Sequence, residues 1–410
     1  YNTAGNFYGL GGGGMANINS PSPTITNSIF WENLKDGSNS VPGADIDNND
    51  SSPTVSYCLT QENSDYDGAH NGVNNNGTGI INNQDPLFVD AANGDFSLRG
   101  CSPAINAGTT VSHTTDILGN PHVGIVDMGA YEYQGIPYST NIYVNINATG
   151  TNDGSSWKNA FRNLQDAIDA NCNGIDIWVA AGTYLPTASP DGTTTDNRNK
   201  AFHLAADMKI YGGFDGTETL LSQRDAATNI TILSGDFSGD DGFTGSGSTF
   251  AITGNTENAY HVMITANLRE PVIDGFTIKG GNANGSGTID YQSKTYNNSK
   301  GGGMYNIDSE IMIIKNSIFS YNTADEDGGG MANVSSDPII INTTFSYNTA
   351  VYSGGGMVNA FSSSPTVTNT TFSYNTVVNS GGGMYNGGGS PTITNTTFLH
   401  NTAKYGGGMY

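Results

Sequence analysis

The last third of the chain consists of short runs in which polar and apolar residues alternate. Residues 390–398 read Ser-Pro-Thr-Ile-Thr-Asn-Thr-Thr-Phe, as expected for a strand with one buried face. Gly and Asn separate successive runs, and both tolerate the left-handed backbone that sharp bends require. No stretch within these runs keeps the 3.6-residue period of a helix. The pattern predicts two or three short strands per repeating unit, joined by turns made by its Asn and Gly residues.

The repeating unit is about 26 residues long, because five copies of Gly-Gly-Gly-Met recur at spacings of 27, 26, 27 and 25 residues. A sixth copy ends at Met15. Each Met except the last is followed by a Phe after 14 or 15 residues, and Asn recurs two residues after Met and three residues before and after Phe. The marked positions are Met304, Met331, Met357, Met384 and Met409; Phe30, Phe319, Phe345, Phe372 and Phe398; and the Asn sets 17/306/333/359/386, 27/316/342/369/395 and 33/322/348/375/401.

Stacking these units places like residue over like residue at the roughly 4.8 Å spacing of neighbouring strands. The predicted fold is therefore all-β, a parallel β-helix with coils of about 26 residues. One coil buries only about four apolar side chains, worth about 1.5 to 3 kcal/mol each, against roughly 1 to 2 kcal/mol of backbone entropy per residue. Stability must therefore come from contacts between neighbouring coils. The predicted core ladders are Met304, Met331, Met357 and Met384 with Phe319, Phe345, Phe372 and Phe398, and the predicted turn ladder is Asn316, Asn342, Asn369 and Asn395.

Two further sets of motifs lie outside the regular coils. The first set is residues 141–144, 153–157, 160–161, 164–167, 177–184, 210–214 and 273–278, and the second set is residues 101–108, 116–121 and 127–132. The first set resembles the opening of secreted bacterial right-handed parallel β-helix repeat proteins, and the Gly-Gly-Gly-Met coils resemble the repeats of these proteins and of polymorphic outer-membrane proteins. The second set is similar to the closing segment of choice-of-anchor β-helix proteins. The resemblance implies a right-handed fold and secretion.

The order of these motifs predicts the domain organisation, because a closing segment precedes an opening one. Residues 1–135 are expected to be the C-terminal part of one β-helical module, with its closing segment at 101–133. A linker at 136–140 leads to the N-terminal part of a second module at 141–410. Its opening and cap are expected at 141–230 and its regular coils at about 300–410. We interpret the chain as part of a tandem array; the alternative is an ordinary two-domain protein.

One segment of the opening module has helical periodicity. Trp157, Phe161, Leu164 and Ile168 lie at i, i+4, i+7 and i+11, on one face of a helix. This spacing predicts a short capping helix near 157–170, with Ser155 or Ser156 as N-cap, lying across the open end of the stack. The alternative interpretation is an amphipathic helix that binds a partner.

Composition and charge exclude some partners. The 410 residues include 14 basic and 37 acidic side chains, a formal charge of −23, which repels nucleic acid. No apolar stretch has the roughly 20 residues needed to cross a bilayer, so no membrane insertion of this segment is expected. The three cysteines show no metal-site spacing. Cys58 could pair with Cys101, which would leave Cys172 free or paired elsewhere.

Candidate chemistry is sparse, and no catalytic residue or cofactor-binding residue is predicted. The sequence shows no Gly-x-Ser-x-Gly motif, and its few Arg and Lys residues do not suit a groove for acidic sugars. The only ion considered is Ca²⁺, which prefers six to eight oxygen ligands. The candidate ligands are Asp236, Asp240 and Asp241 in one acidic loop, and Asp45 and Asp47, which begin like an EF-hand loop that Asp50 and Ser56 do not complete. Other acidic turns contain Asp65 and Asp67, or Asp325, Glu326 and Asp327.

Two classes of function remain open. The preferred hypothesis is a structural or adhesive extracellular protein, part of a tandem β-solenoid that forms a long fibre or filament at the cell surface. Its partners would be itself or neighbouring modules, end to end, and surface glycans are a further possible partner. The alternative is a carbohydrate-binding or polysaccharide-degrading β-helix. An enzyme requires a groove with convergent carboxylates, whereas a scaffold requires regular faces.

Overall fold

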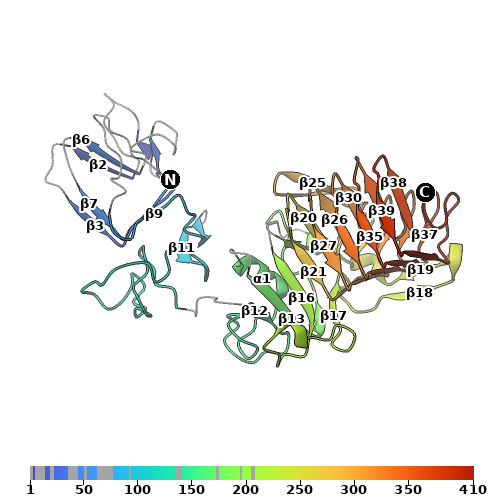
Figure 1. The fold of residues 1–410 in the computed structure, drawn as a ribbon, viewed down its shortest axis with the longest axis horizontal. Coiled ribbons are helices and arrows are strands. Elements are labelled where there is room, and N and C mark those ends of the chain that lie inside the picture. The colour runs from blue at the N-terminus through green and yellow to red at the C-terminus, as the bar shows by residue number, and fades with distance from the viewer. Residues whose placement is uncertain are drawn as a thin grey trace. The chain divides into compact units, whose positions relative to one another are not determined.

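The computed structural model describes residues 3–4, 14–18, 23–35, 45–49, 53–61, 77–91, 94–134, 141–171, 175–193, 196–204 and 208–410. The chain forms two compact units, Tyr1–Tyr138 (unit 1) and Ser139–Tyr410 (unit 2). Cys172 and the predicted linker lie outside the described residues. In both units strands from distant parts of the sequence pair in parallel, which confirms the predicted parallel β-helix (Figure 1).

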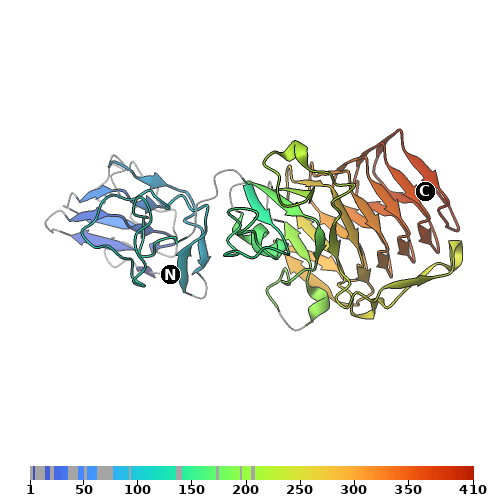
Figure 2. The same cartoon turned by 90° about the horizontal axis from the view of Figure 1, so that it is seen from below.

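Unit 2 is a stack of coils whose strands form three long parallel sheets (Figure 2). The first sheet contains β12 (Asn141–Val144), β13 (Asp176–Ala180), β16 (Lys209–Phe214), β21 (Val272–Asp274), β27 (Ile313–Lys315), β31 (Ile339–Ile341), β35 (Thr366–Thr368) and β39 (Thr392–Thr394). The second contains β14 (Gly182–Tyr184), β17 (Thr231–Ser234), β22 (Phe276–Lys279), β28 (Ile318–Ser320), β32 (Thr344–Ser346), β36 (Thr371–Ser373) and β40 (Thr397–Leu399). The third contains β15 (Phe202–Leu204), β20 (Met263–Ala266), β26 (Met304–Ile307), β30 (Met331–Val334), β34 (Met357–Ala360) and β38 (Met384–Gly387).

A shorter parallel sheet and two antiparallel hairpins complete the strands of unit 2. The short sheet contains β23 (Asn282–Ala283), β29 (Thr323–Ala324), β33 (Thr349–Ala350) and β37 (Thr376–Val377). One hairpin consists of β18 (Gly242–Thr244) and β19 (Ala251–Thr253), and the other of β24 (Thr288–Tyr291) and β25 (Lys294–Asn297). Short 3₁₀ turns lie at Asn197–Asn199, Leu221–Gln223, Gly247–Thr249 and Asn255–Glu257.

The core of the regular coils of unit 2 contains ladders of identical side chains. Met304, Met331, Met357 and Met384 are register partners on successive coils, and all four are fully buried. The rings of Phe319, Phe345, Phe372 and Phe398 stack nearly parallel, with centroids 4.8, 4.8 and 5.0 Å apart. Because like side chains fill each level, the packing of one coil repeats in the next.

Two of the three Asn sets are buried amide ladders. Asn306 donates to Asn333 at 2.7 Å, and Asn333 donates to Asn359 at 2.8 Å. The expectation that the Asn residues make turns is therefore wrong for the set at 306, 333 and 359, which lies within β26, β30 and β34. The set at 322, 348 and 375 is buried but still stands at a corner, because Asn322 lies between β28 and β29. Only the set three residues before Phe has the left-handed backbone, with φ of 49° at both Asn316 and Asn342. The other members of this exposed turn set, Asn369 and Asn395, have φ of 51° and 48°.

The predicted capping helix is present but shorter than expected. Helix α1 is Leu164–Ala170, and its N-cap, Asn163, makes no side-chain cap hydrogen bond. It buries Leu164 and Ile168 against β12, β13 and β15, which include the first strands of two of the long sheets. The helix therefore covers one end of the stack, as Figure 1 shows.

The predicted start of this helix is wrong, because Trp157 and Phe161 make longer-range contacts instead. Trp157 packs its ring on Tyr143, with centroids 4.8 Å apart, and donates from Nε1 to the Glu218 carbonyl at 2.8 Å. The Phe161 amide donates to the Tyr143 carbonyl at 2.9 Å. The Ser156 hydroxyl accepts from the Asn159 amide, so it closes a separate turn.

Unit 1 contains partial coils of the same kind. Its parallel pairs are β1 (Thr3–Ala4) with β5 (Leu34–Lys35), β2 (Met15–Ile18) with β6 (Ile46–Asn49), β3 (Thr24–Thr26) with β7 (Thr54–Ser56), and β4 (Ile29–Phe30) with β8 (Leu59–Thr60) and then β9 (Ile81–Asn82). An antiparallel hairpin, β10 (Phe88–Asp90) and β11 (Asp95–Leu98), precedes residues 101–133, which form mainly turns.

Residues 101–133 pack on the coils of unit 1. Met128 and Ala104 lie in one core cluster with Leu59 of β8 and Leu98 of β11. Cys58 carries a free, buried thiol, so it does not form the disulfide with Cys101 that we considered.

Candidate functional site

A hairpin arm brings acidic side chains of unit 2 together. We define the arm as residues 235–258, which connect β17 to the segment before β20 and contain the β18–β19 hairpin. In Figure 1 it is the yellow ribbon that runs along one side of the coils. Its base has an acidic turn on one side and Asn255–Glu257 on the other. Folding the hairpin therefore places residues from its two ends next to each other.

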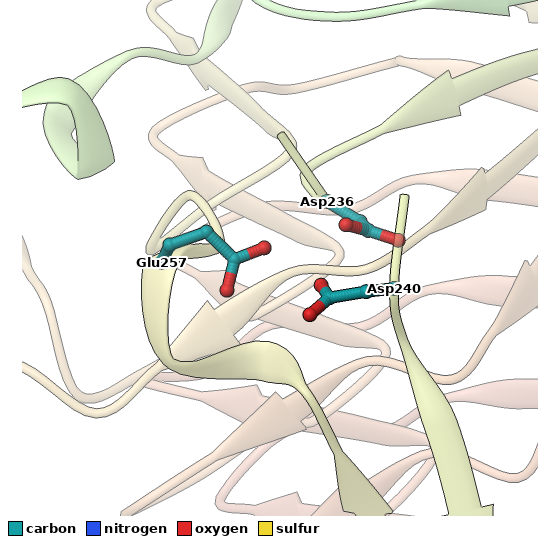
Figure 3. A group of neighbouring side chains, drawn as sticks. All are labelled: Asp236, Asp240 and Glu257. Carbon is teal, nitrogen blue, oxygen red and sulfur yellow. The ribbon is translucent and has the colours of Figure 1, made fainter. Parts of the chain in front are cut away.

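Asp236, Asp240 and Glu257 form an acidic cluster at this base. One carboxylate oxygen from each residue lies within 4.8 Å of the other two (Figure 3). Asp236 is buried, and its side chain accepts from the Gly239 amide at 2.6 Å. Asp240 is exposed and Glu257 is half-buried. The structure thus brings together two of the three predicted residues of this loop and adds Glu257.

Asp241 lies beside the cluster but faces another partner. Its two carboxylate oxygens accept from Asn258 Nδ2 at 3.2 and 3.0 Å. Burial raises the pKa of Asp241 to about 6; the Asn258 bond opposes this rise, and the charges of Asp236, Glu257 and Asp240 add to it. The rise therefore comes mainly from burial, and the neighbouring carboxylates contribute a smaller part of it.

The cluster has the chemistry of a hard-cation site. Ca²⁺ takes carboxylate and carbonyl oxygens, and Asp236, Asp240 and Glu257 are the residues that could hold it. Glu257 Oε1 and the neighbouring Asn258 Oδ1 are buried atoms with no hydrogen-bond partner among the described residues. Sequence reasoning missed Glu257 because it lies 21 positions after Asp236, and only the hairpin between them brings the two together.

The remaining candidate ligands have other roles or lie outside the described residues. Asp45 is buried in unit 1, where it accepts from Asn33 Nδ2 at 3.0 Å and from the Gln61 amide at 2.8 Å. It therefore links separate segments of the coils. The Asp47 side chain is not among those the structure describes, nor are Asp65 and Asp67. In the 325–327 turn, Glu326 and Asp327 pair with Lys300 at 3.3 and 2.9 Å.

The tip of the arm rests on an aromatic ladder at the surface of the coils. The rings of Tyr321, Tyr347 and Tyr374 stack at 5.3 and 4.9 Å, within 3° of parallel. Phe243 of the arm stacks on Tyr321, and Phe250 lies 5.5 Å from Tyr347. Because the stacked rings cover one another's faces, this ladder presents mainly ring edges and does not form a sugar-stacking platform.

The arm also bonds to a more distant coil. The Thr376 hydroxyl of β37 donates to the Gly247 carbonyl at 3.1 Å. Together with the aromatic contacts, this bond fixes the arm along at least three successive coils. The acidic cluster is thus attached to an element that contacts much of the regular stack.

No helix among the residues that the structure describes is long and apolar enough to cross a membrane. Comparison of the chain with protein-family models, with curated proteins and with solved structures found no match. The assignment to the parallel β-helix architecture therefore rests on the pairing of the chain's own strands.

Proposed function

We propose that this chain is part of an extracellular structural or adhesive β-solenoid, one segment of a tandem array that forms a surface fibre. The observation that carries the proposal is the register of unit 2. Met304, Met331 and Met357 are direct partners on consecutive coils, as are the Phe and Asn residues of the same coils. Such a stack grows in one direction only and forms a stiff rod.

The proposed partners are neighbouring modules or copies, joined end to end. Each regular coil presents nearly the same backbone and side-chain groups above and below it, so a further coil of this pattern satisfies the same hydrogen bonds. The support for an extracellular location is the resemblance of the short opening and closing motifs, given in the sequence analysis, to those of secreted β-helix proteins. Net acidity, with few basic side chains, favours solubility in such an array.

Immunogold labelling of intact, unpermeabilised cells that make the protein tests this proposal. We expect label along surface filaments, and we expect protease added to the cells to remove it. A chain that is labelled only after permeabilisation contradicts the proposed location. Purified protein that stays monomeric at all concentrations and belongs to no filament contradicts the end-to-end assembly.

Within this proposal, Ca²⁺ binds Asp236, Asp240 and Glu257 and fixes the base of the arm. The support comes from the proximity of the three carboxylates and from the unbonded buried oxygens of Glu257 and Asn258. The ion has a structural role here, and no reaction step is assigned to it.

Carbohydrate binding is a second candidate function, favoured by an aromatic cleft in unit 1. The cleft has a volume of about 510 Å³, and its lining includes Trp31, Phe88, Phe96 and Tyr131. Phe96 is 45% exposed, so an aromatic side chain is accessible to an apolar face of a sugar. Phe361 is an exposed aromatic residue of unit 2 that does not line the cleft, so it provides the control. Glycan-array binding that Trp31→Ala abolishes and Phe361→Ala leaves unchanged supports this function. Binding that survives Trp31→Ala excludes the cleft as the site.

A further inference from the structure

The turns of residues 111–132 in unit 1 border a second cavity that is open to solvent, and two histidines line it. Its volume is about 470 Å³, and its wall includes His113, His122 and Glu132 together with Asn27 from the preceding coil. Neither histidine was assigned a role from the sequence. They are nine positions apart, and only the folding of this segment brings their rings together.

Glu132 fixes the orientation of the His122 ring. His122 Nδ1 lies 3.0 Å from Glu132 Oε2, and the Glu132 side chain is 2% exposed. The same carboxylate accepts from the amides of Val123 at 2.8 Å and Asp127 at 3.1 Å. The ionised Glu132 carboxylate can only accept hydrogen bonds, so His122 must carry a proton on Nδ1 to donate to it. In the neutral ring, Nε2 then carries the lone pair.

The opposite nitrogen of His122 makes no hydrogen bond within the part of the chain that the structure describes. This nitrogen, Nε2, is buried. The ring of His113 lies close by, with centroids 5.3 Å apart and planes tilted by 59°. Two imidazoles that bind one tetrahedral ion through their nitrogens have centroids roughly 5 Å apart, given metal–nitrogen bonds of about 2.0 to 2.1 Å.

The charges around the cavity also favour a cation. Asp116, Asp127 and Glu132 line it, and the described lining residues include no Lys or Arg. Asp116 accepts hydrogen bonds from the Leu118, Asn120 and Glu132 amides, so it is occupied in holding the turn. Asp127 likewise accepts hydrogen bonds from the Asn106 amide at 2.7 Å and from the Tyr133 amide at 2.6 Å. A positive ion in the cavity would offset this accumulation of carboxylates.

We propose that His113 and His122 bind a divalent transition-metal ion of the Zn²⁺ type. Glu132 is a positioning residue that orients His122 through Nδ1, the arrangement by which carboxylates commonly support histidine ligands. Water completes the coordination. Imidazole nitrogen suits Zn²⁺, whereas the all-oxygen cluster at Asp236 suits Ca²⁺. The two sites therefore differ in metal class, and this inference is independent of the proposed function.

Titration of the full chain with Zn²⁺, and with Co²⁺ followed by visible absorption, tests the site. We expect one equivalent to bind at the histidines and affinity to fall at least tenfold in His113→Ala and in His122→Gln. Glu132→Gln should weaken binding by about 10-fold to 100-fold while the ion still binds. His400→Gln, which changes an exposed histidine stacked on Tyr374 in unit 2, is the matched control and should bind as the parent does.

Three results would overturn the proposal. The first is no Zn²⁺ binding at ion concentrations up to about 0.1 mM, which would mean a Kd well above that value. The second is binding unchanged in His113→Ala, and the third is binding lost in Asp236→Asn instead. His113 is exposed, so its truncation should leave the fold intact. Circular dichroism and the metal-free melting temperature of each variant verify this. The His113→Ala result decides the question even if His122→Gln is less stable.

Discussion

Buried asparagine side chains satisfy much of the polar bonding inside unit 2. Asn348 is fully buried, and its Nδ2 donates to the Phe319 carbonyl at 2.9 Å and to Asn375 Oδ1 at 3.0 Å. Its Oδ1 accepts from the amide and from Nδ2 of Asn322, at 3.2 and 3.0 Å. All four bonding positions of this amide are used. A side chain that only accepts, or only donates, cannot replace it.

Changing Asn348 to Asp should therefore destabilise the protein strongly. The carboxylate would face the Phe319 carbonyl and Asn375 Oδ1 without a donor between them, at a cost of about 3 kcal/mol or more. Urea unfolding followed by circular dichroism measures the loss. Asn342→Asp is the matched control, because Asn342 is exposed in a left-handed turn that Asp also tolerates; we expect less than about 1 kcal/mol there. Equal losses at the two positions would contradict the role assigned to the buried amides.

At the scale of elements, the arm is the part of unit 2 that departs most from the coil pattern. Its tip contacts Tyr321, Tyr347 and Thr376, whereas its base carries Asp236 and Glu257. Phe243 is 62% exposed despite its stacking on Tyr321. The arm therefore buries little apolar surface, and its attachment depends on a few specific contacts at its two ends.

Calcium should stabilise the arm more than the coils. Adding Ca²⁺ to EDTA-treated protein should protect backbone amides of residues 242–253 from hydrogen exchange and raise the melting temperature by a few degrees. The double variant Asp236→Asn, Glu257→Gln should lose both effects, whereas Asp95→Asn, at an exposed acidic position in unit 1, should keep them. If EDTA and Ca²⁺ leave exchange in the arm unchanged, the cluster is not a calcium site.

The sequence predicted the coils well, but not the arm or the start of the helix. Coil stacking could be predicted because like residues recur at a fixed interval, and each repeat gives the same signal again. Glu257 joins Asp236 only through a hairpin that has no repeating pattern. Trp157 has helical spacing to Leu164, yet its Nε1 bonds to Glu218, 61 positions away. Such long-range contacts outweigh local periodicity, and the spacing alone could not indicate them.

At the scale of the whole molecule, buried titratable groups make the free energy of unfolding depend on pH. His261 is fully buried, and burial lowers its pKa from 6.5 to about 4. The unfolded chain takes up this proton below about pH 6.5, whereas the folded chain resists it until about pH 4. The contribution of neutral His261 to the free energy of unfolding is therefore fully present above pH 6.5 and is lost as the pH falls towards 4. Asp241 has the opposite effect, because its pKa is raised in the folded chain. Its contribution to the free energy of unfolding increases as the pH falls from about 6 to 3.8.

We expect the free energy of unfolding to fall by about 3 kcal/mol between pH 7 and 4 through His261, at about 1.4 kcal/mol per pKa unit. His261→Gln should reduce this pH dependence, and Asp241→Asn should make the decline steeper because it removes the opposing group. Melting temperatures at half-unit pH steps provide the measurement. His400→Gln, with an exposed ring, should follow the parent curve. A parent and a His261→Gln variant with the same pH profile would contradict this assignment.

The position of the arm also bears on how the chain finds its alignment during folding. Four consecutive coils carry the same Met and Phe levels, so a strand that slips by one whole coil still matches sulfur with sulfur and ring with ring. The ladders alone therefore give the native alignment and one shifted by a whole coil nearly the same energy. The arm is not repeated along the chain, and its residues Phe243, Phe250 and Gly247 contact three different coils. A slipped chain would forfeit those unique contacts, so the arm distinguishes the native alignment from its near copies.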